Sequence, residues 1–266
     1  VDSEIMLGLL QASGFEITNR EQDADVLIVN TCSFINDAKE ESINTILELS
    51  QHKDRGRCRA LLVAGCLAQR YAHDLLVDMP EIDAVIGTGS IPELTGVIHR
   101  ALNGEKVLLV GKPGYLHTAE SPKVQATPFY SAYLKIAEGC DNCCTYCTIP
   151  HVRGPFRSRD ADDILTEAAS MAACGVTELT LVAQDTTRYG MDRYNKSSLH
   201  TLLSRLTHLE ELVWIRLLYT YPALLNDDLI QLMAEEEKLC RYLDIPLQHA
   251  STPVLQRMNR RGSGEQ

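Results

Sequence analysis

Two successive series of short apolar runs, each followed by an amphipathic stretch, constrain the fold of this 266-residue chain more than any other feature. In the first series, strands are predicted at Asp25–Asn30, Ala60–Ala64 and Ala84–Ile86, and helices at about 2–13, 35–51, 67–77 and 91–102. Near-continuous apolar strands are typical of a parallel sheet that is covered by helices on both faces. The first part of the chain is therefore predicted to be an α/β domain with a parallel sheet.

The second series has the same rhythm with longer repeats. Strands are predicted at Ala132–Ala137, Glu178–Ala183, Leu212–Tyr219 and Tyr242–Leu247, and helices at about 161–174, 198–207, 226–237 and 252–260. Four consecutive βα units with right-handed crossovers are the beginning of a (β/α) barrel, in which chemistry collects at the C-terminal ends of the strands. The second part is predicted to be a partial barrel of the TIM type.

Between the two series, the stretch from Gly104 to Phe129 contains three prolines and little periodicity, which indicates a connection between domains. The predicted organisation is a first domain at 1–113, a linker at 114–130 and a second domain at 131–266. The apolar residues from Ile35 to Leu49, near helical spacing, are most simply explained by core packing. The chain opens at Val1 without a methionine and closes directly after a helical pattern, so we expect it to be truncated at both ends.

Composition limits the classes of function. No apolar run approaches the roughly 20 residues that span a bilayer, and no signal segment opens the chain, so a cytosolic protein without a membrane partner is predicted. The formal net charge of -11 argues against broad nucleic-acid binding, which depends on Lys and Arg, and favours a protein or small-molecule substrate. Nine cysteines in a cytosolic chain indicate metal binding or catalysis rather than disulfides.

Four of these cysteines lie within eight residues, Cys140, Cys143, Cys144 and Cys147. They can be interpreted as C-x3-C-x2-C, with Cys143 spare, or as two abutting C-x2-C pairs. Zinc sites built from two pairs normally need roughly a dozen or more residues between them to fold the second pair back over the metal. The spacing therefore favours three thiolates on an iron–sulfur cluster over zinc, a redox dithiol or unliganded core cysteines. Such a cluster keeps one iron free for an outside ligand.

Several motifs carry a resemblance to a known family. The run from Cys140 to Cys147, with the aromatic Tyr146, resembles the signature of radical S-adenosylmethionine enzymes, in which the cofactor binds the open iron and yields a 5′-deoxyadenosyl radical. The segments AYLKIAEGC (132–140) and RGPFRSR (153–159), with VNTC (29–32) and GC (65–66), are similar to methylthiotransferases. The resemblance covers nearly the whole chain and implies insertion of sulfur and a methyl group at a carbon–hydrogen bond.

The resemblance also implies a second cluster. In that family an N-terminal domain contributes three more cysteines, two of which match Cys32 and Cys66, while the third would precede Val1. From the residues alone, Cys32 and Cys66 are more simply ordinary buried thiols. The implied cofactors are thus two 4Fe-4S clusters, the N-terminal one lacking a ligand here, and S-adenosylmethionine. Cys58, Cys174 and Cys240 match no ligand position.

Two branches of the family are plausible, one modifying the aspartate β-carbon of a small-subunit ribosomal protein and one modifying an adenosine in transfer RNA. The segments VDSE (1–4), VAQDT (182–186), LLYTYP (217–222) and DIPLQHAS (244–251) look like the first branch. The implied partners are a ribosomal protein as substrate and a reducing donor such as flavodoxin or ferredoxin. In that family further barrel strands and a C-terminal substrate-binding domain follow, and we expect both to lie outside this chain. A noncatalytic zinc or redox module remains the alternative of another class.

Polar residues near the predicted strand ends are candidates for cofactor binding. Gln184 and Asp185 end the second barrel strand, Arg216 lies within the third, and Gln248 and Ser251 end the fourth. They can hold ribose hydroxyls and the methionyl carboxylate. The simpler alternative is that they cap helices or satisfy loop backbone.

Candidates also lie in the segment that follows the cysteines. Tyr146 can pack beside the adenine or fill the barrel mouth. Arg153, Arg157 and Arg159 can neutralise the cofactor carboxylate or a cluster, although a solvated basic loop is the alternative for each. His151 and His249 are left out of the metal set because three thiolates suffice.

Overall fold

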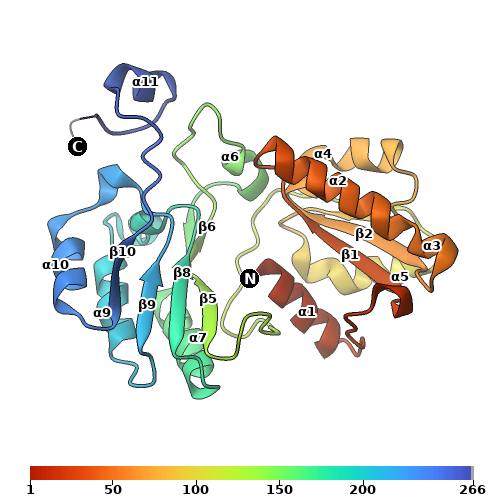
Figure 1. Cartoon of the computed structure of the whole chain (residues 1–266), viewed down its shortest axis with the longest axis horizontal. Coiled ribbons are helices and arrows are strands. Elements are labelled where there is room, and N and C mark those ends of the chain that lie inside the picture. Colours follow the sequence, from red (N-terminus) through yellow and green to blue (C-terminus); the bar gives the residue numbers. More distant parts are fainter. Residues whose placement is uncertain (265–266) are drawn as a thin grey trace.

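The computed structural model describes residues 1–264 and contains two four-stranded parallel sheets that lie next to one another (Figure 1). The first sheet has the order β1 (Val26–Thr31), β2 (Ala60–Gly65), β3 (Ala84–Ile86) and β4 (Val107–Leu109), so neighbours in the sheet are neighbours in the chain. Its helices are α1 (Asp2–Ala12), α2 (Asn36–Ser50), α3 (His52–Arg55), α4 (Cys66–Asp78) and α5 (Leu94–Leu102), with single turns η1 (Glu21–Asp23) and η2 (Ile91–Glu93). The predicted α/β domain with a parallel sheet is confirmed.

Two apolar cores lie on opposite faces of this sheet. Alternate residues of a strand point to opposite faces, so Leu62 packs with α1 and α5 while Leu61 packs with α2 and α4. Helix α2 departs from the predicted core packing. Ile46 is fully buried, but Ile43 and Leu47 are 38% and 45% exposed. The helix therefore contacts the sheet through few side chains, and some of its apolar residues face outward.

Strand β4 was not predicted, because Gly104–Phe129 was interpreted wholly as a connection. Val107, Leu108 and Leu109 pair in parallel with β3, and Val107 fills the core. Three residues are too few to show a strand period, which explains why the pattern was missed.

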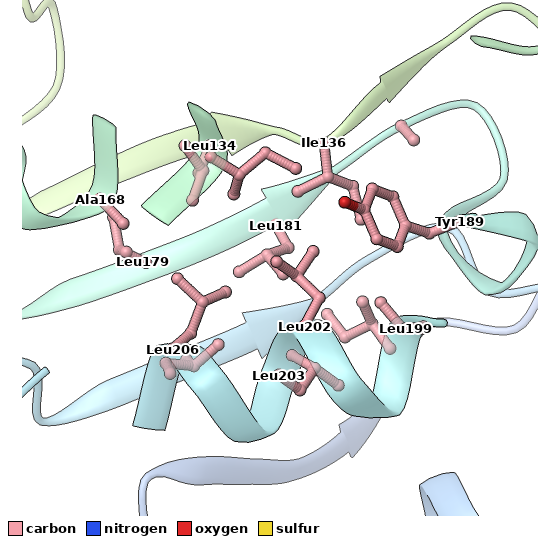
Figure 2. Close-up of a cluster of buried hydrophobic side chains, with 14 of the residues drawn as sticks. Leu134, Ile136, Ala168, Leu179, Leu181, Tyr189, Leu199, Leu202, Leu203 and Leu206 are labelled. Atoms are coloured by element: carbon pink, nitrogen blue, oxygen red, sulfur yellow. The ribbon is translucent and has the colours of Figure 1, made fainter. Parts of the chain in front are cut away.

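The second sheet has the order β10 (Leu239–Leu243), β9 (Trp214–Leu217), β8 (Glu178–Val182) and β5 (Ser131–Lys135), all parallel. Helices α7 (Ala161–Ala173), α9 (Leu199–Thr207) and α10 (Asp227–Glu235) cover one face, and Figure 2 shows leucines of α9 packed against β8 and Tyr189. Residues such as Tyr133, Thr180 and Arg216 occupy the alternate positions and face the other side. This is the predicted partial barrel.

Shorter elements complete this half of the chain. They are the antiparallel pair β6 (Ala137–Glu138) and β7 (Arg157–Ser158), the helices α6 (Ile149–Arg153), α8 (Met191–Tyr194) and α11 (Thr252–Arg257), and the turns η3 (Thr186–Arg188) and η4 (Pro222–Leu224). The fourth barrel strand was predicted three residues too late, at Tyr242–Leu247. It ends at Leu243, and Pro246, which has no backbone N–H to donate, lies in an irregular segment that leads to α11.

The connecting segment, residues 114–130, is bound to both halves of the chain. Lys123 Nζ lies 3.5 Å from Glu4 of α1 and 3.5 Å from Glu167 of α7. The buried His117 accepts a 2.9 Å hydrogen bond from Arg159, which is itself 2% exposed. The segment is therefore a fixed strap rather than a free tether.

Among residues 1–264, no helix combines the length and apolarity needed to cross a membrane.

Candidate functional site

A cavity of about 650 Å³ opens at the C-terminal ends of the barrel strands. The three cysteines of the C-x3-C-x2-C interpretation, Cys140, Cys144 and Cys147, all line it. Val1 and Phe34 from the first half of the chain close one side, so both halves contribute to its wall. A single cavity with three thiols is the site at which the sequence predicted chemistry.

The approach to Cys140 is shaped by Gly139. This glycine has φ +84°, and a Cβ there would lie 2.1 Å from the Pro155 carbonyl oxygen, so only glycine fits. Its N–H donates to Gln184 Oε1 at 2.6 Å, and the next N–H, of Cys140, donates to the Gly154 carbonyl at 3.1 Å. The start of the cysteine loop is thereby fixed between β8 and the segment after α6.

The rest of the loop is held from two further directions. Asn142 Nδ2 donates to the buried Asp185 at 2.8 Å, and Thr187 Oγ1 donates to the other carboxylate oxygen at 2.6 Å. From the C-terminal segment, Asn259 Nδ2 donates at 3.0 Å to the carbonyl of Cys143, whose side chain is exposed. The sulfur of Cys143 thus lies outside the set that lines the cavity, as the spare position in the predicted motif should.

The thiols are close enough to affect one another. Burial, together with the nearby Asp185, Cys147 and Cys144, raises the pKa of Cys140 to about 11, against a lowering contribution from the backbone N–H of Asn142. Burial also raises the pKa of Cys147, with a contribution from Cys144. Without metal, Cys140 and Cys147 are protonated at neutral pH, so binding a metal at these sulfurs displaces protons.

The donor set fits a cubane cluster. Within residues 1–264, no three His, Cys, Asp or Glu side chains meet around a single metal ion. A four-iron cluster does not require this, because each thiolate binds a different iron. Three thiols around one cavity, with polar side chains beside them, match a cluster with an open corner.

Cys32 and Cys66 form a second location. Cys32 directly follows β1 and Cys66 directly follows β2, and the last residues of these strands, Thr31 and Gly65, are paired in register. Burial raises the pKa of Cys66, the Arg153 charge lowers it, and Cys32 raises it. The two cysteines are therefore neighbours at the C-terminal edge of the first sheet, and they do not line the large cavity.

Four charged residues lie where α1 meets the barrel, of which Lys135 and Glu138 are buried and Asp2 and Arg153 are partly buried. Asp2 accepts from Lys135 Nζ at 2.5 Å and from Arg153 at 2.5 Å, and Glu138 accepts from the same cations at 2.6 and 3.4 Å. Burial alone would raise the pKa of Asp2, but Lys135 and Arg153 hold it well below its usual range. We call Asp2, Lys135, Glu138 and Arg153 the charge tetrad.

The predicted cofactor residues divide into two groups. Tyr146, Gln184, Asp185 and Gln248 line the cavity, although Gln184 and Asp185 also hold the cysteine loop, which was the simpler alternative. Arg153, Arg216 and Ser251 do not line it.

Each residue of the second group has another partner. Arg153 belongs to the tetrad next to Cys66, and Arg216 donates to Glu178 at 2.6 Å. The backbone N–H of Ser251, the residue before α11, donates to His249 Nδ1 at 2.8 Å. The other two loop arginines are also engaged. Arg157 donates to the Pro155 carbonyl, and Arg159 is buried against Asp163 and Glu167.

Sequence reasoning missed Arg260. Its side chain lines the cavity and contacts the cysteine loop, although 116 residues separate it from Cys144. The run MNRRG (258–262) carries no local signal that distinguishes Arg260 from Arg261. The two arginines differ in their exposure to solvent, because Arg260 is 7% exposed whereas Arg261 is exposed.

Comparison with known proteins agrees with this geometry. Residues 1–87 match the model of the uncharacterized protein family UPF0004. Residues 134–266, half of the chain, match the model of the radical SAM superfamily. The chain belongs to this superfamily. The predicted fold class, a parallel α/β domain followed by a partial radical SAM barrel, is confirmed.

Similar curated proteins carry a more specific name. The chain is 66% identical over its whole length to the ribosomal protein uS12 methylthiotransferase RimO of Pelotomaculum thermopropionicum, of which it covers 60%. It is 55% identical over 98% of its length to the RimO of Desulforudis audaxviator, of which it covers 58%. The chain thus spans about 60% of the length of these relatives.

Solved structures show the same fold at low identity. The radical S-adenosylmethionine methyltransferase TsrM from Kitasatospora setae, with cobalamin and a [4Fe-4S] cluster bound, has a TM-score of 0.67 at 13% identity. The match covers 99% of this chain and 60% of that one. At this identity the likeness concerns the fold alone.

Proposed function

We propose that this chain is the catalytic part of a radical S-adenosylmethionine methylthiotransferase that acts on the aspartate β-carbon of a small-subunit ribosomal protein. The observation that carries the proposal is the convergence of Cys140, Cys144 and Cys147 on one cavity. The relatives named as uS12 methylthiotransferases support the substrate. Transfer RNA is the alternative substrate, and the net charge of -11 weighs against it.

In this proposal the residues of the cavity divide the work. Cys140, Cys144 and Cys147 would hold a 4Fe-4S cluster, which would supply the electron that breaks a carbon–sulfur bond of S-adenosylmethionine. Gln248 and Tyr146 present polar atoms and a ring to the rest of that cofactor. Gln184 and Asp185 orient the cysteine loop through their hydrogen bonds to Gly139 and Asn142.

The second location, at Cys32 and Cys66, takes part in the transfer of sulfur to the substrate. Cys32 and Cys66 would be two ligands of a second 4Fe-4S cluster, as the resemblance to methylthiotransferases implies. Arg153 lies against Cys66 and supplies positive charge there, which stabilises the thiolate that metal binding requires. The charge tetrad fixes this edge of the first sheet against the barrel.

The domain organisation, cellular location and electron donor of the protein are part of the proposed function. The domains are 1–113 and 131–266, connected by the strap at 114–130, and separate cores in the two halves support this division. A cytoplasmic location and a flavodoxin-like or ferredoxin-like donor follow from a ribosomal substrate and a one-electron step.

The decisive experiment compares two adjacent cysteines in the full-length protein. After anaerobic reconstitution, Cys144→Ala should lose the iron and sulfide of one cluster and all dithionite-dependent formation of 5′-deoxyadenosine. Cys143→Ala, the matched control, should keep both, because its side chain is exposed and outside the cavity lining. Equal cofactor cleavage by the two variants would refute the assignment, and zinc without iron would favour the noncatalytic module.

A second pair of variants separates the two cysteine locations. Cys32→Ala should preserve 5′-deoxyadenosine formation yet stop methylthio transfer to ribosomal protein uS12, measured by mass spectrometry. Cys174→Ala, which removes another exposed thiol, should preserve both 5′-deoxyadenosine formation and methylthio transfer. Modification of transfer RNA instead of the ribosomal protein would select the other branch of the family.

A further inference from the structure

Arg260 is a buried cation without an anionic partner in the described part of the protein. The residue is 7% exposed, and among residues 1–264 Arg260 forms no ion pair with a carboxylate. Removing a charge from water is costly unless an opposite charge or hydrogen bonds compensate for it. The position therefore calls for negative charge nearby.

The contacts of Arg260 show where that charge would be. Nη1 lies 4.0 Å from Cys144 Sγ and 3.4 Å from the hydroxyl of Tyr146, both on the cysteine loop. Nη2 donates to the Pro246 carbonyl, and the guanidinium lies 4.4 Å from the centre of the Tyr221 ring. The carbonyl and the ring fix the plane of the guanidinium, while Nη1 is directed at the sulfur.

We propose that Arg260 is the counter-cation of the site formed by Cys140, Cys144 and Cys147, and that its charge favours uptake of an electron there. The inference rests on the proposed function, in which Cys140, Cys144 and Cys147 hold a cluster with three thiolates. Reduction adds one electron from an external one-electron donor and neither forms nor breaks a bond. A fixed positive charge next to a ligand sulfur stabilises the more negative, reduced state.

The arginine is a positioning residue that acts through Cys144, and a purely structural role makes a different prediction. As a simple brace, it would hold the loop through Pro246 and Tyr146 without affecting the reduction potential. As a counter-cation, it affects the potential even where the loop and the cluster stay intact. The reduction potential therefore distinguishes the two roles independently of turnover.

The test uses the full-length protein carrying Cys32→Ala and Cys66→Ala, so that a single cluster remains, and a redox titration followed by electron paramagnetic resonance. In Arg260→Gln, the ratio of reduced to oxidised cluster at the parent midpoint should fall about tenfold, which is a shift of about 59 mV for one electron. Arg261→Gln removes the same charge from the adjacent exposed side chain and should leave the ratio nearly unchanged. Arg260→Lys keeps the charge and should stay close to the parent.

Each outcome bears on one proposal. An unchanged midpoint in Arg260→Gln with full iron content overturns the counter-cation while leaving the cluster assignment intact. If Arg260→Gln does not retain iron, Arg260→Lys decides, because equal loss of iron in the lysine variant would show a brace and reject the charge role. A parent protein that assembles no cluster refutes the proposed function itself.

Discussion

Asp185 shows how one side chain can control the cysteine loop. The carboxylate is 1% exposed and accepts hydrogen bonds from Asn142, inside the loop, and from Thr187. Asp185→Ala should lower the free energy of unfolding by about 1–3 kcal/mol, because it leaves the buried Asn142 amide without its acceptor. Urea denaturation of the metal-free protein measures the loss.

A conservative change at the same position provides the control. Asp185→Asn keeps an acceptor oxygen for Asn142 and should recover more than half of the lost stability. Equal destabilisation by alanine and asparagine would show that the negative charge, rather than the hydrogen bond to the loop, is what the fold requires.

At the residue scale, prediction from sequence succeeded where the relevant groups are close in the chain. The three cysteines lie within eight residues, so their spacing alone restricts the geometry. Gln184 and Asp185 line the cavity because they directly follow β8, whereas Gln248 lines it from the irregular segment after β10. Arg260 reaches Cys144 across 116 residues, and no local pattern encodes that contact.

Substitution of two helical glycines by alanine, one in α1 and one in α5, should have opposite effects on stability. A Cβ on Gly8 of α1 would lie 2.3 Å from the backbone of Pro122 in the strap, whereas a Cβ on Gly96 of α5 would meet nothing within 4 Å. Gly8→Ala should therefore destabilise the protein by about 1–3 kcal/mol through overpacking. Gly96→Ala should stabilise it by about 0.5–1 kcal/mol through helix propensity.

The opposite signs make the pair a test of the strap. Chemical denaturation of both variants under the same conditions is sufficient. A stabilised Gly8→Ala protein would mean that residues 114–130 do not rest against α1 in solution.

At the element scale, the missed and shifted strands share a physical cause. Strand β4 has three residues, and strand β10 ends before an irregular segment whose apolar residues, such as Leu247, also look like strand. In both places pairing with a neighbouring strand, rather than a local pattern, determines where the strand lies. The longer helices, whose periodicity extends over several turns, were located within a few residues.

The charge tetrad should decide how firmly the two halves of the molecule are docked. Asp2→Asn removes both ion pairs that cross from α1 to the barrel and leaves Lys135 and Arg153 with excess buried charge. We expect a loss of about 3–5 kcal/mol, as is typical when one partner of a buried pair is removed. Thermal unfolding at neutral pH measures it.

An exposed ion pair is the matched control. Glu105→Gln breaks the pair with Arg100, in which both side chains are about half exposed, and should have no measurable effect. Because Lys135 and Arg153 lower the pKa of Asp2, its contribution should be complete at neutral pH and decline as the pH falls below about 4. Equal effects of the two variants would exclude a special role for the tetrad.

The contact between the two halves was beyond prediction from the sequence. Asp2 and Arg153 are 151 residues apart, and each looks like an ordinary surface residue when its own segment is considered. The alternating pattern predicts two layered units but contains no information on how one rests on the other.

The cavity has a thermodynamic consequence, because Val1 and Phe34 come from one unit and the cysteine loop from the other. Any molecule that fits between them gains contacts only while the units stay together. By mass action, its binding energy is added to the energy that joins them. A small molecule bound in the cavity would then stabilise the contact between the two units as well as react, and its release would weaken that contact.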